Sequence, residues 1–595
     1  MVNSACGKNK EISRKTKSFK DPAYGYIEID ANLVGDVIDT PAFQRLRRII
    51  QTSYEPLYPS ATHNRFVHSL GVYHLGNYVS EIIRQHSFTN LTRIIDDKSR
   101  SKYERCLEVF RYACLLHDVG HAPFSHTGES FYLPCVENKG YEKLHQRIAN
   151  LCNDETLLLK NLEEPDKIAA PHELMSIIIA LSTFSSSFKT NLEKTFFARA
   201  IAGYPFSEKE QLDDGIDASF LNCLVLLLHS SPIDVDRLDY LIRDALETGF
   251  SSVSIDYQRL LGGVRIIDHD GRCEVVFTKQ AVSVLENVVY AHDSERKWIQ
   301  SHPVIGYEAK LLTRAFTSIN KEFACELENK TIFCEDALTA KGITPAKFHK
   351  AIRISYLCDA DVLFLLKNTT SQSAHQYLDR RTRYIPFWKS EAEFCAIFNT
   401  KEWKKDFKRL KAVFDFLVNY LVKRDISEIC DEMLQKLECE SKKAKAGVKK
   451  SFSNANEALR KAVVSAQMEI LLQFVADLKR FALGRSLSFK FQIFDAKTFS
   501  SGFAQDGLPN LWIELHPNTP PVKLEDIMPV LGMRPKDKSF PENIYYIFHE
   551  RNNVGKTNLT ECLIKKFKIF ITTHADAIDN AFKKKGIKGV VSNAD

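Results

Sequence analysis

Residues 116–124, which read LHDVGHAPF, constrain this chain more than any other stretch. The apolar run 112–116 (YACLL) predicts a helix, and a glycine and a proline end it just after the pair His117-Asp118. An imidazole and a carboxylate beside each other at a helix end can share one divalent ion, with His121 facing whatever the ion binds. A capped helix end with a hydrogen-bonded histidine would look the same, so the rest of the chain has to decide.

Two more predicted helices carry the same kinds of side chain. His68 lies near the start of one, and Asp236 lies in an acid-rich segment that follows the apolar run 224–228 and is therefore expected to adjoin the core. Carboxylates next to a core need partners, and a metal ion is one. Together His68, His117, Asp118 and Asp236 form a donor set that suits Mg, Mn, Fe, Zn or Ni and leaves positions open for water and substrate. The sequence therefore predicts a divalent-metal site.

Such a site is typical of hydrolases, because the ion lowers the pKa of a bound water and neutralises charge on a phosphoryl oxygen. Arg65 stands one helical turn before His68, where it can grip a phosphate on the same face. His121, His126 and His145 are further groups that can carry protons near neutral pH. These residues indicate a metal-dependent phosphohydrolase.

A chain of 595 residues can bury a substantial core and is expected to fold as more than one domain. Its 14 cysteines are scattered without a Cys-x-x-Cys pair, which argues against a disulfide framework or a zinc finger. The first residues lack the apolar core of a signal peptide, and no apolar run is long enough to span a membrane. We therefore expect a cytoplasmic protein with no membrane partner. The net charge of +6 is weak support for nucleic acid as a partner.

The predicted elements are mainly helical and divide the chain into three parts. Residues 1–20 are a basic tail that is expected to be flexible. Residues 21–400 form the core, with the motifs in 21–250, and residues 401–595 form helices plus a small α+β lobe.

Short β segments interrupt the helices. A hairpin is predicted over 264–277, turning at Asp270-Gly271. The lysine-rich stretch 442–450 is either a solvated linker or a binding patch. The strand-like runs of the last part are 488–494, 511–515 and 543–548.

In their order, these motifs resemble the HD phosphohydrolase superfamily. More closely, the chain is similar to the deoxynucleoside triphosphate triphosphohydrolases, the group with sterile-alpha-motif-containing and bacterial dGTPase-like members. The stretches that carry the resemblance are 21–25 (DPAYG), 39–47 (DTPAFQRLR), 63–72 (HNRFVHSLGV), 117–126 (HDVGHAPFSH) and 234–244 (DVDRLDYLIRD). The resemblance implies a mainly α fold, with an HD-domain helical phosphohydrolase core, short β-hairpins and the small α+β C-terminal lobe. It also implies hydrolysis of a dNTP to a deoxynucleoside and inorganic triphosphate.

Carried over by position, the resemblance implies roles for single residues. The implied metal ligands are His68, His117, Asp118 and Asp236, and the implied catalytic residues are His121, His126, Glu129 and His145. The implied substrate-binding residues are Gln51, Arg65, Arg237, Tyr240, Asp244, His292 and Gln300. Among these, Arg65, Arg237 and Tyr240 match contacts of the triphosphate, and Gln51 and Asp244 match contacts of the sugar 3′-hydroxyl.

Three positions depart from the family pattern. Glu129 stands where relatives have an aspartate turned toward His126. His292 stands where a phosphate-binding arginine is expected, and Gln300 where a tyrosine guards the 2′ face of the sugar. The alignment there is anchored by His302 alone, so Arg296 or Lys297 could replace the missing arginine. Discrimination between dNTPs and ribonucleotides stays open.

A second, regulatory site is also implied. Asp39, Gln44 and Arg47 look like the residues with which relatives read a guanine nucleotide between subunits. The resemblance thus implies activation by a bound nucleotide and a homo-oligomer, as a dimer, tetramer or hexamer. The alternative is a helix that makes surface ion pairs and subunit contacts.

Two other functions stay open. One is an HD phosphohydrolase that acts on a cyclic, oligomeric or modified nucleotide and releases monophosphate instead of triphosphate. The other is a nucleotide sensor or a single-strand nucleic-acid binder, whose binding would be salt-sensitive. Hydrolysis of dNTPs would suit nucleotide-pool control and antiviral or phage defence equally, and the sequence does not choose between them.

Overall fold

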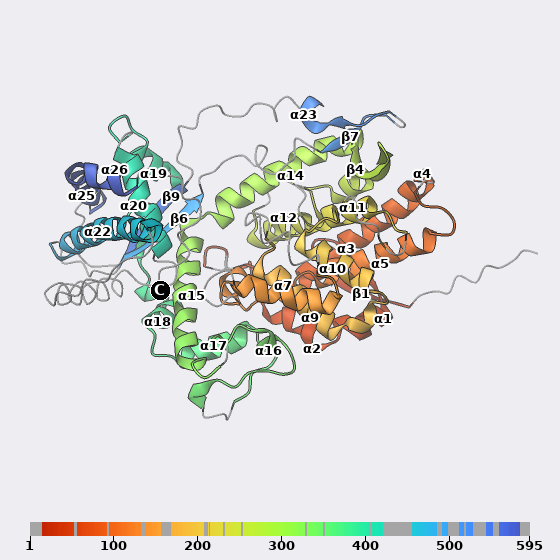
Figure 1. Ribbon diagram of the computed structural model, residues 1–595, viewed down its shortest axis with the longest axis horizontal. Coiled ribbons are helices and arrows are strands. Elements are labelled where there is room, and N and C mark those ends of the chain that lie inside the picture. Colours follow the sequence, from red (N-terminus) through yellow and green to blue (C-terminus); the bar gives the residue numbers. More distant parts are fainter. Residues whose placement is uncertain are drawn as a thin grey trace, which may run out of the picture.

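The structure is a computed structural model of the chain, and Figure 1 shows it to be built mainly from helices. The described residues are 15–52, 56–91, 94–132, 139–155, 168–207, 212, 215–229, 233–250, 254–327, 330–348, 352–403, 406–420, 455–484, 491–497, 511–516, 519–527, 543–550 and 559–582. The lysine-rich stretch 442–450 lies outside them. The mainly α fold class is confirmed, with short hairpins and a small α+β group near the C-terminus.

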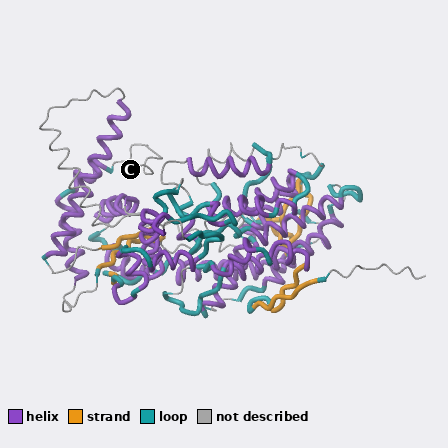
Figure 2. The backbone as a smooth tube through the Cα atoms, turned by 90° about the horizontal axis from the view of Figure 1, so that it is seen from below, coloured by secondary structure: helices purple, strands orange, loops and turns teal. Residues whose placement is uncertain are grey.

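The described chain opens with a hairpin, of which the sequence predicts the turn and the second strand over 21–29 but not the first strand. Strand β1 (Thr16–Asp21) pairs antiparallel with β2 (Gly25–Asp30), and Gly25 has the positive φ of 80° that the turn requires. The prediction of a flexible tail is therefore wrong for residues 16–20. They form a strand because the ladder satisfies their backbone and the hydroxyl of Thr16 donates to Glu28 across it, at 2.9 Å. Figure 2 shows the hairpin at one edge of the molecule.

The proposed metal ligands lie on two helices and directly after the end of a third. The two helices are α3 (Arg65–Ile82) and α12 (Val235–Thr248), and the third is α5 (Arg100–Leu116). Asn64 caps α3 and Asp234 caps α12, each by accepting a backbone N–H three residues on, at 3.3 and 2.7 Å. The caps fix where each helix starts and hence which way its first turns face.

Residue types predict a helix that starts at Pro41, with Thr40 as its N-cap, and continues through 42–50; the structure confirms the cap but not the length. Thr40 is the N-cap and Pro41 the first residue of α2 (Pro41–Gln44), after which the chain tightens into a 3-10 turn over Arg45–Arg48. Ahead of it lies α1 (Ala31–Leu33).

The remaining helices of the core pack with α3, α5 and α12 through one large cluster of buried apolar side chains. The run 224–228 adjoins the core as expected from its composition, with every residue except the exposed Leu226 in this cluster. These helices are α4 (Phe88–Asn90), α6 (His126–Glu129), α7 (Lys139–Cys152), α9 (Pro171–Thr183), α10 (Asn191–Ala202), α11 (Ala218–Leu228), α13 (Tyr257–Gly262), α14 (Val282–Glu295), α15 (Pro303–Phe323), α16 (Glu335–Leu338), α17 (Asp359–Lys367) and α18 (Gln372–Leu378).

The predicted hairpin is confirmed as β3 (Val264–His269) and β4 (Arg272–Thr278), and Asp270 and Gly271 at its turn both have positive φ. A later strand, β7 (Trp512–Glu514), pairs in parallel with β4 and is followed by β8 (Val522–Lys523) and α23 (Leu524–Ile527). The assignment of run 511–515 to the C-terminal lobe is therefore wrong. Ile513 is buried in the core cluster, and this burial favours the pairing of the segment with the hairpin.

A second cluster of buried apolar side chains holds the C-terminal group of elements together. Packing there already begins with Tyr307 of α15 and Tyr384, ahead of the boundary predicted at residue 400. Figure 1 shows α15 running between this group and the core. Its elements are β5 (Ile385–Pro386), β6 (Phe491–Lys497), β9 (Asn543–His549), α19 (Glu391–Phe398), α20 (Asp406–Tyr420), α22 (Ala455–Leu483), α25 (Leu559–Thr573) and α26 (Ala575–Ala581). No helix in the described part of the chain is both long and apolar enough to cross a bilayer.

We predict that Gly71→Ala destabilises the protein by about 1–3 kcal/mol, because α3 and α12 approach so closely there that a Cβ has no room. That Cβ would stand 1.8 Å from Asp239 Oδ1 and 2.5 Å from Arg243 Nη2. Gly35→Ala is the matched control, since nothing lies within 4 Å of a Cβ at that position. Urea or thermal unfolding measures the difference, and equal stability of the two variants would contradict this account of the helix contact.

Candidate active site

The four predicted metal ligands converge at one point of the core. His68 Nε2 lies 3.2 Å from His117 Nε2, and Asp236 Oδ1 lies 2.9 Å and 3.5 Å from these two atoms. Asp118 Oδ2 lies 3.6 Å from each of them. The structure thus brings together side chains from α3, α12 and the residues that follow α5.

Both imidazoles are turned so that Nε2 faces this point. His117 Nδ1 donates to the carbonyl of Cys114 at 2.9 Å, and His68 Nδ1 lies 2.7 Å from Asp239 Oδ2. Such contacts behind the ring fix the tautomer in which Nε2 carries the lone pair that a metal needs. Asp239 is held by Arg243 at 3.0 Å, and Arg243 in turn binds Asp21 at 2.9 Å. Asp21, Asp239 and Arg243 are in the stretches that carry the family resemblance, but sequence reasoning assigned them no role.

The electrostatics of the centre fit a divalent cation. Although burial opposes ionisation, Arg65 and the two neighbouring histidines hold the pKa of Asp118 well below its usual value. Burial also opposes the charge on His68, yet Asp236 and Asp239 raise its pKa to about 10. Without a metal the centre therefore attracts protons. A divalent ion would replace those protons among the ring nitrogens of His68 and His117 and the carboxylate of Asp236, with Asp118 Oδ2 3.6 Å from each nitrogen.

A second group of titratable side chains is formed by His121, His126, Glu129 and His172. His126 and Glu129 stand three residues apart on the short helix α6, and His126 Nδ1 lies 3.1 Å from Glu129 Oε1. The other oxygen of Glu129 contacts Nδ1 of His172, at the start of α9. The expected pairing of Glu129 with His126 is thus present, and the glutamate bridges two imidazoles.

His121 lies beneath this pair in a buried position. Its ring stacks on that of His172 with 4.3 Å between the centroids, and neither ring nitrogen has a hydrogen-bond partner among the described residues. Burial and the positive charges of Arg65 and His172 hold the pKa of His121 well below its usual value. His121 is therefore a neutral imidazole with unused polar atoms next to the site.

His145 does not join this group. It lies on α7, where its ring nitrogens contact the hydroxyl of Tyr204 at 3.1 Å and the carbonyl of Tyr141 at 2.8 Å. The structure brings His172, and not His145, to Glu129. Sequence reasoning missed His172, although Pro171 at the first position of α9 and the capping glutamate Glu173 marked a helix start there.

Arg65 is buried and engaged with the protein. Its guanidinium donates to Asp118 at 2.7 Å, to Ser125 Oγ at 2.9 Å and to the carbonyl of Gln51 at 3.0 Å. Arg65 therefore joins the metal centre to the turn that precedes His126. A phosphate contact of Arg65 stays a prediction.

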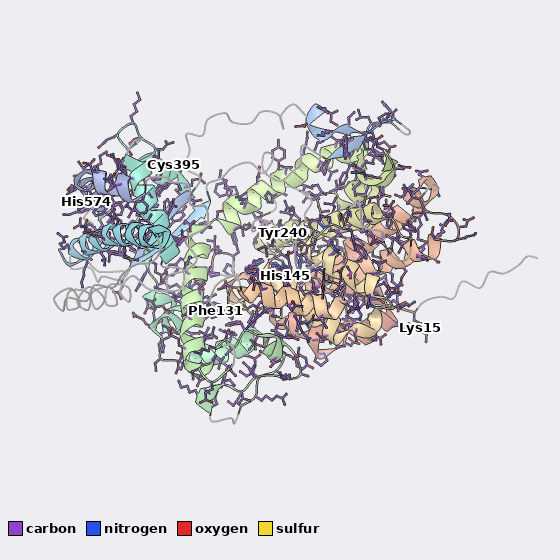
Figure 3. The ribbon with its side chains drawn as sticks, viewed as in Figure 1. Lys15, Phe131, His145, Tyr240, Cys395 and His574 are labelled. Carbon is purple, nitrogen blue, oxygen red and sulfur yellow. The ribbon has the colours of Figure 1, made fainter. Side chains whose placement is uncertain are left out.

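The other predicted substrate residues lie along α12 and the end of α14. Arg237, Tyr240 and Asp244 are spaced so that they share one side of α12, and Figure 3 marks Tyr240 in the middle of the molecule. Asp244 Oδ1 lies 2.7 Å from His63 Nε2. The pKa of Glu295 is raised, chiefly by the burial of its own carboxyl group and next by the negative charge of Asp244.

Three further predicted residues flank this side. Gln300 Nε2 donates to Glu295 at 2.8 Å, and His292 Nδ1 lies 3.7 Å from Asp293. Gln51 is buried, and its side-chain oxygen has no partner among the described residues. The roles of all these residues toward a substrate stay predictions.

The predicted regulatory residues lie together on the surface. Asp39 is 53% exposed and pairs with Lys17 Nζ at 3.1 Å, while Arg47 donates to Gln44 Oε1 at 2.8 Å and stacks on Phe66. The contact of Asp39 with Lys17 is a surface ion pair of the kind that the alternative interpretation expects. A nucleotide-binding role for Asp39, Gln44 and Arg47 stays a prediction.

Residues 65–182, which include His68, His117 and Asp118, match the family model of the HD domain. This segment is an HD domain. Asp236 lies beyond the matched residues and approaches His68 and His117 from α12.

Similar proteins extend this finding. An uncharacterized protein of Mycoplasma genitalium is 30% identical over 276 residues, which are 45% of this chain and 52% of that protein. The deoxynucleoside triphosphate triphosphohydrolase SAMHD1 of Xenopus laevis is 27% identical over 321 residues, 53% of this chain and 47% of that protein. The chain thus spans about half the length of these curated relatives. A crystal structure of a phosphohydrolase from Bacteroides thetaiotaomicron has a TM-score of 0.50 at 16% identity, covering 90% of this chain and 100% of that one, which is a likeness of fold.

We predict that Asp239→Asn weakens the binding of Mn²⁺ to the HD domain by roughly 10- to 100-fold, because the carboxylate that orients His68 is lost. Calorimetric titration of the full chain measures the affinity. Asp268→Asn on β3 is the control, since Asp268 contacts only its own hairpin turn in the described structure. Unchanged affinity in Asp239→Asn would show that His68 needs no such support.

A second prediction concerns pH. Although burial lowers it, the ion pair with Glu129 raises the pKa of His172 to about 9 from 6.5. The contribution of protonated His172 to stability is therefore complete below pH 6.5 and is lost as the pH rises through about 9. Relative to His172→Gln, the unsubstituted protein should lose about 2–3 kcal/mol of unfolding free energy across that range.

Urea unfolding of the metal-free protein at several pH values tests this. His145→Gln is the control and should keep the pH slope, because His145 makes no contact with Glu129 in the described structure. A slope that survives in His172→Gln would assign the titration to another group.

Proposed function

We propose that this protein is a divalent-metal-dependent hydrolase that splits dNTPs into a deoxynucleoside and inorganic triphosphate. The observation that carries the proposal is that the pair of His126 and Glu129 is joined through Arg65 to the four predicted metal ligands. Arg65 bridges the two parts, since it binds both Asp118 and Ser125, the residue before His126. The similarity to a protein named as a deoxynucleoside triphosphate triphosphohydrolase supports the choice of substrate.

The ion would be held by His68, His117, Asp118 and Asp236, and when bound it supplies an activated water and a positive charge for a phosphoryl oxygen. Its identity among Mg, Mn, Fe, Zn and Ni is left open by this donor set.

His126 is the proposed general acid. Its Nδ1 faces Glu129, and its side chain is 63% exposed, so that Nε2 points away from the carboxylate. In that position Nε2 can hand a proton to the 5′ oxygen of the leaving deoxynucleoside. Glu129 and His172 hold the imidazole in place, and the longer side chain of the glutamate still reaches both rings.

The side of α12 that carries Arg237, Tyr240 and Asp244 is the proposed substrate surface. Arg237 and Tyr240 would contact the triphosphate, and Asp244 with Gln51 the sugar 3′-hydroxyl. His292 and Gln300 would lie along the opposite wall. Asp244 is held there by His63, whose Nε2 lies 2.7 Å from its Oδ1, and by a side-chain hydrogen bond with Glu295.

A second candidate is hydrolysis of a cyclic, oligomeric or modified nucleotide at the same centre. The observation that favours it is that Gln300 is bound to Glu295, whereas the dNTP-hydrolysing relatives are expected to have a tyrosine there that excludes a 2′-hydroxyl. Activation by a nucleotide bound near Asp39, Gln44 and Arg47, and assembly into a homo-oligomer, belong to the first proposal as further expectations.

The test is product analysis of the purified protein with each dNTP and rNTP, singly and in pairs, with Mg²⁺ or Mn²⁺. We expect triphosphate and deoxynucleoside as products and no turnover in His117→Ala. His126→Ala should lower kcat by about 10²–10⁴-fold, since it removes the general acid. His145→Ala is the matched control and should keep turnover.

Release of monophosphate instead of triphosphate would favour the second candidate and would be followed by a panel of cyclic and oligonucleotides. Turnover only with pairs of nucleotides would support the activator site. Turnover that survives in His117→Ala would contradict both candidates.

A further inference from the structure

The backbone between His121 and His126 takes an unfavourable course. Phe124 and Ser125 both lie in the left-handed region, with φ of 56° and 51°, although neither is glycine. A non-glycine residue in this region is energetically unfavourable and persists only where its surroundings hold it. Other groups must therefore stabilise this turn.

Asp359, the first residue of α17, stabilises the turn through hydrogen bonds, although it lies 235 residues from Phe124 in the sequence. Its Oδ1 accepts the N–H of Phe124 at 2.7 Å, and its Oδ2 accepts the N–H of Ile50 at 2.8 Å. The hydroxyl of Ser125 donates to the carbonyl of Ile50. The carboxylate of Asp359 thus binds both chain segments that meet at the turn, at Ile50 and at Phe124.

Arg45 ties the same two regions together a second time. Its Nη1 donates to the carbonyl of Leu357 at 2.9 Å, and its Nη2 donates to the carbonyls of Val119 and His121 at 2.8 and 2.9 Å. Arg45 is buried, so these bonds are shielded from water. The segment 357–359 is therefore attached at two points to the residues that carry the catalytic histidines.

The turn matters because both parts of the site depend on it. His126 follows the turn directly. Ser125, within the turn, accepts a hydrogen bond from Arg65 Nε at 2.9 Å, and the same guanidinium donates to Asp118. If Phe124 were released, Ser125 would shift, and with it the direction of His126 and the support of Asp118.

We propose that Asp359 is a positioning residue for this site. In the part of the chain that the structure describes, its carboxylate binds the N–H groups of Ile50 and Phe124 and not a proposed metal ligand, and it acts by holding the turn 124–125 so that His126 keeps its place against Glu129. The turnover readout of this inference rests on the proposed function, whereas the position of the His126 ring does not.

The experiment compares Asp359→Asn, Asp359→Ala and the control Asp361→Asn in the full chain. Asp361 lies on the same helix and accepts the N–H of Cys358 at 2.9 Å, so its substitution also removes a charged acceptor of a backbone N–H but leaves the turn untouched. We expect kcat to fall roughly 10-fold in Asp359→Asn and 100-fold in Asp359→Ala, with KM and bound metal within about twofold. Asp361→Asn should keep kcat even where its melting temperature falls as far.

The ring signals of His126, assigned with His126→Ala in the NMR spectrum of histidine-labelled protein, give a readout that needs no substrate. They should shift or broaden in both Asp359 variants and stay in place in Asp361→Asn. Unchanged signals in a folded Asp359→Asn protein, or equal effects in Asp361→Asn, would overturn the proposal. If no nucleotide is turned over while the His126 signals move only in the Asp359 variants, the proposed function fails and the positioning role stands.

Discussion

The buried carboxylate of Asp239 is the interaction on which the rest of the site depends. It accepts from His68, from Arg243 and from the hydroxyl of Tyr24, at 2.7, 3.0 and 2.8 Å. A buried charge is tolerated only when it is paired and hydrogen-bonded, and breaking such a pair costs about 3–5 kcal/mol. The carboxylate therefore joins α3, α12 and the N-terminal hairpin in one arrangement. Gly71 lets the two helices come close enough for this to happen.

The site holds two groups of histidines, His68 with His117 and His121 with His126 and His172. Their neighbours keep individual members in different charge states. His68 sits between two aspartates and attracts a cation, whether a proton or a metal. His121 has Arg65 and His172 beside it and stays neutral. Glu129 stays ionised between His126 and His172. The site thus combines a place for positive charge between α3 and α12 with a neutral ring and an ionised carboxylate between two imidazoles.

Much of the site could be predicted because its spacing is local. The metal ligands lie near the start or directly after the end of three helices, and caps such as Asn64 and Asp234 are readable from residue type. The partners that cross between distant segments were not readable. His172 reaches Glu129 through the packing of α9 on the core, and Asp359 reaches Phe124 across 235 residues. Neither contact leaves a periodic pattern in the sequence.

Strand pairing shows the same limit and carries a consequence for the architecture. Segment 511–515 was recognisable as a strand, but nothing in its own pattern told which sheet it would join. Since β7 lies on β4 while β6 and β9 pair with each other in the second cluster, the chain crosses between the core and the C-terminal elements, returns, and crosses again. The two hydrophobic clusters are therefore interlaced by the covalent chain, and no single cut in the backbone would divide this molecule into one piece for each cluster.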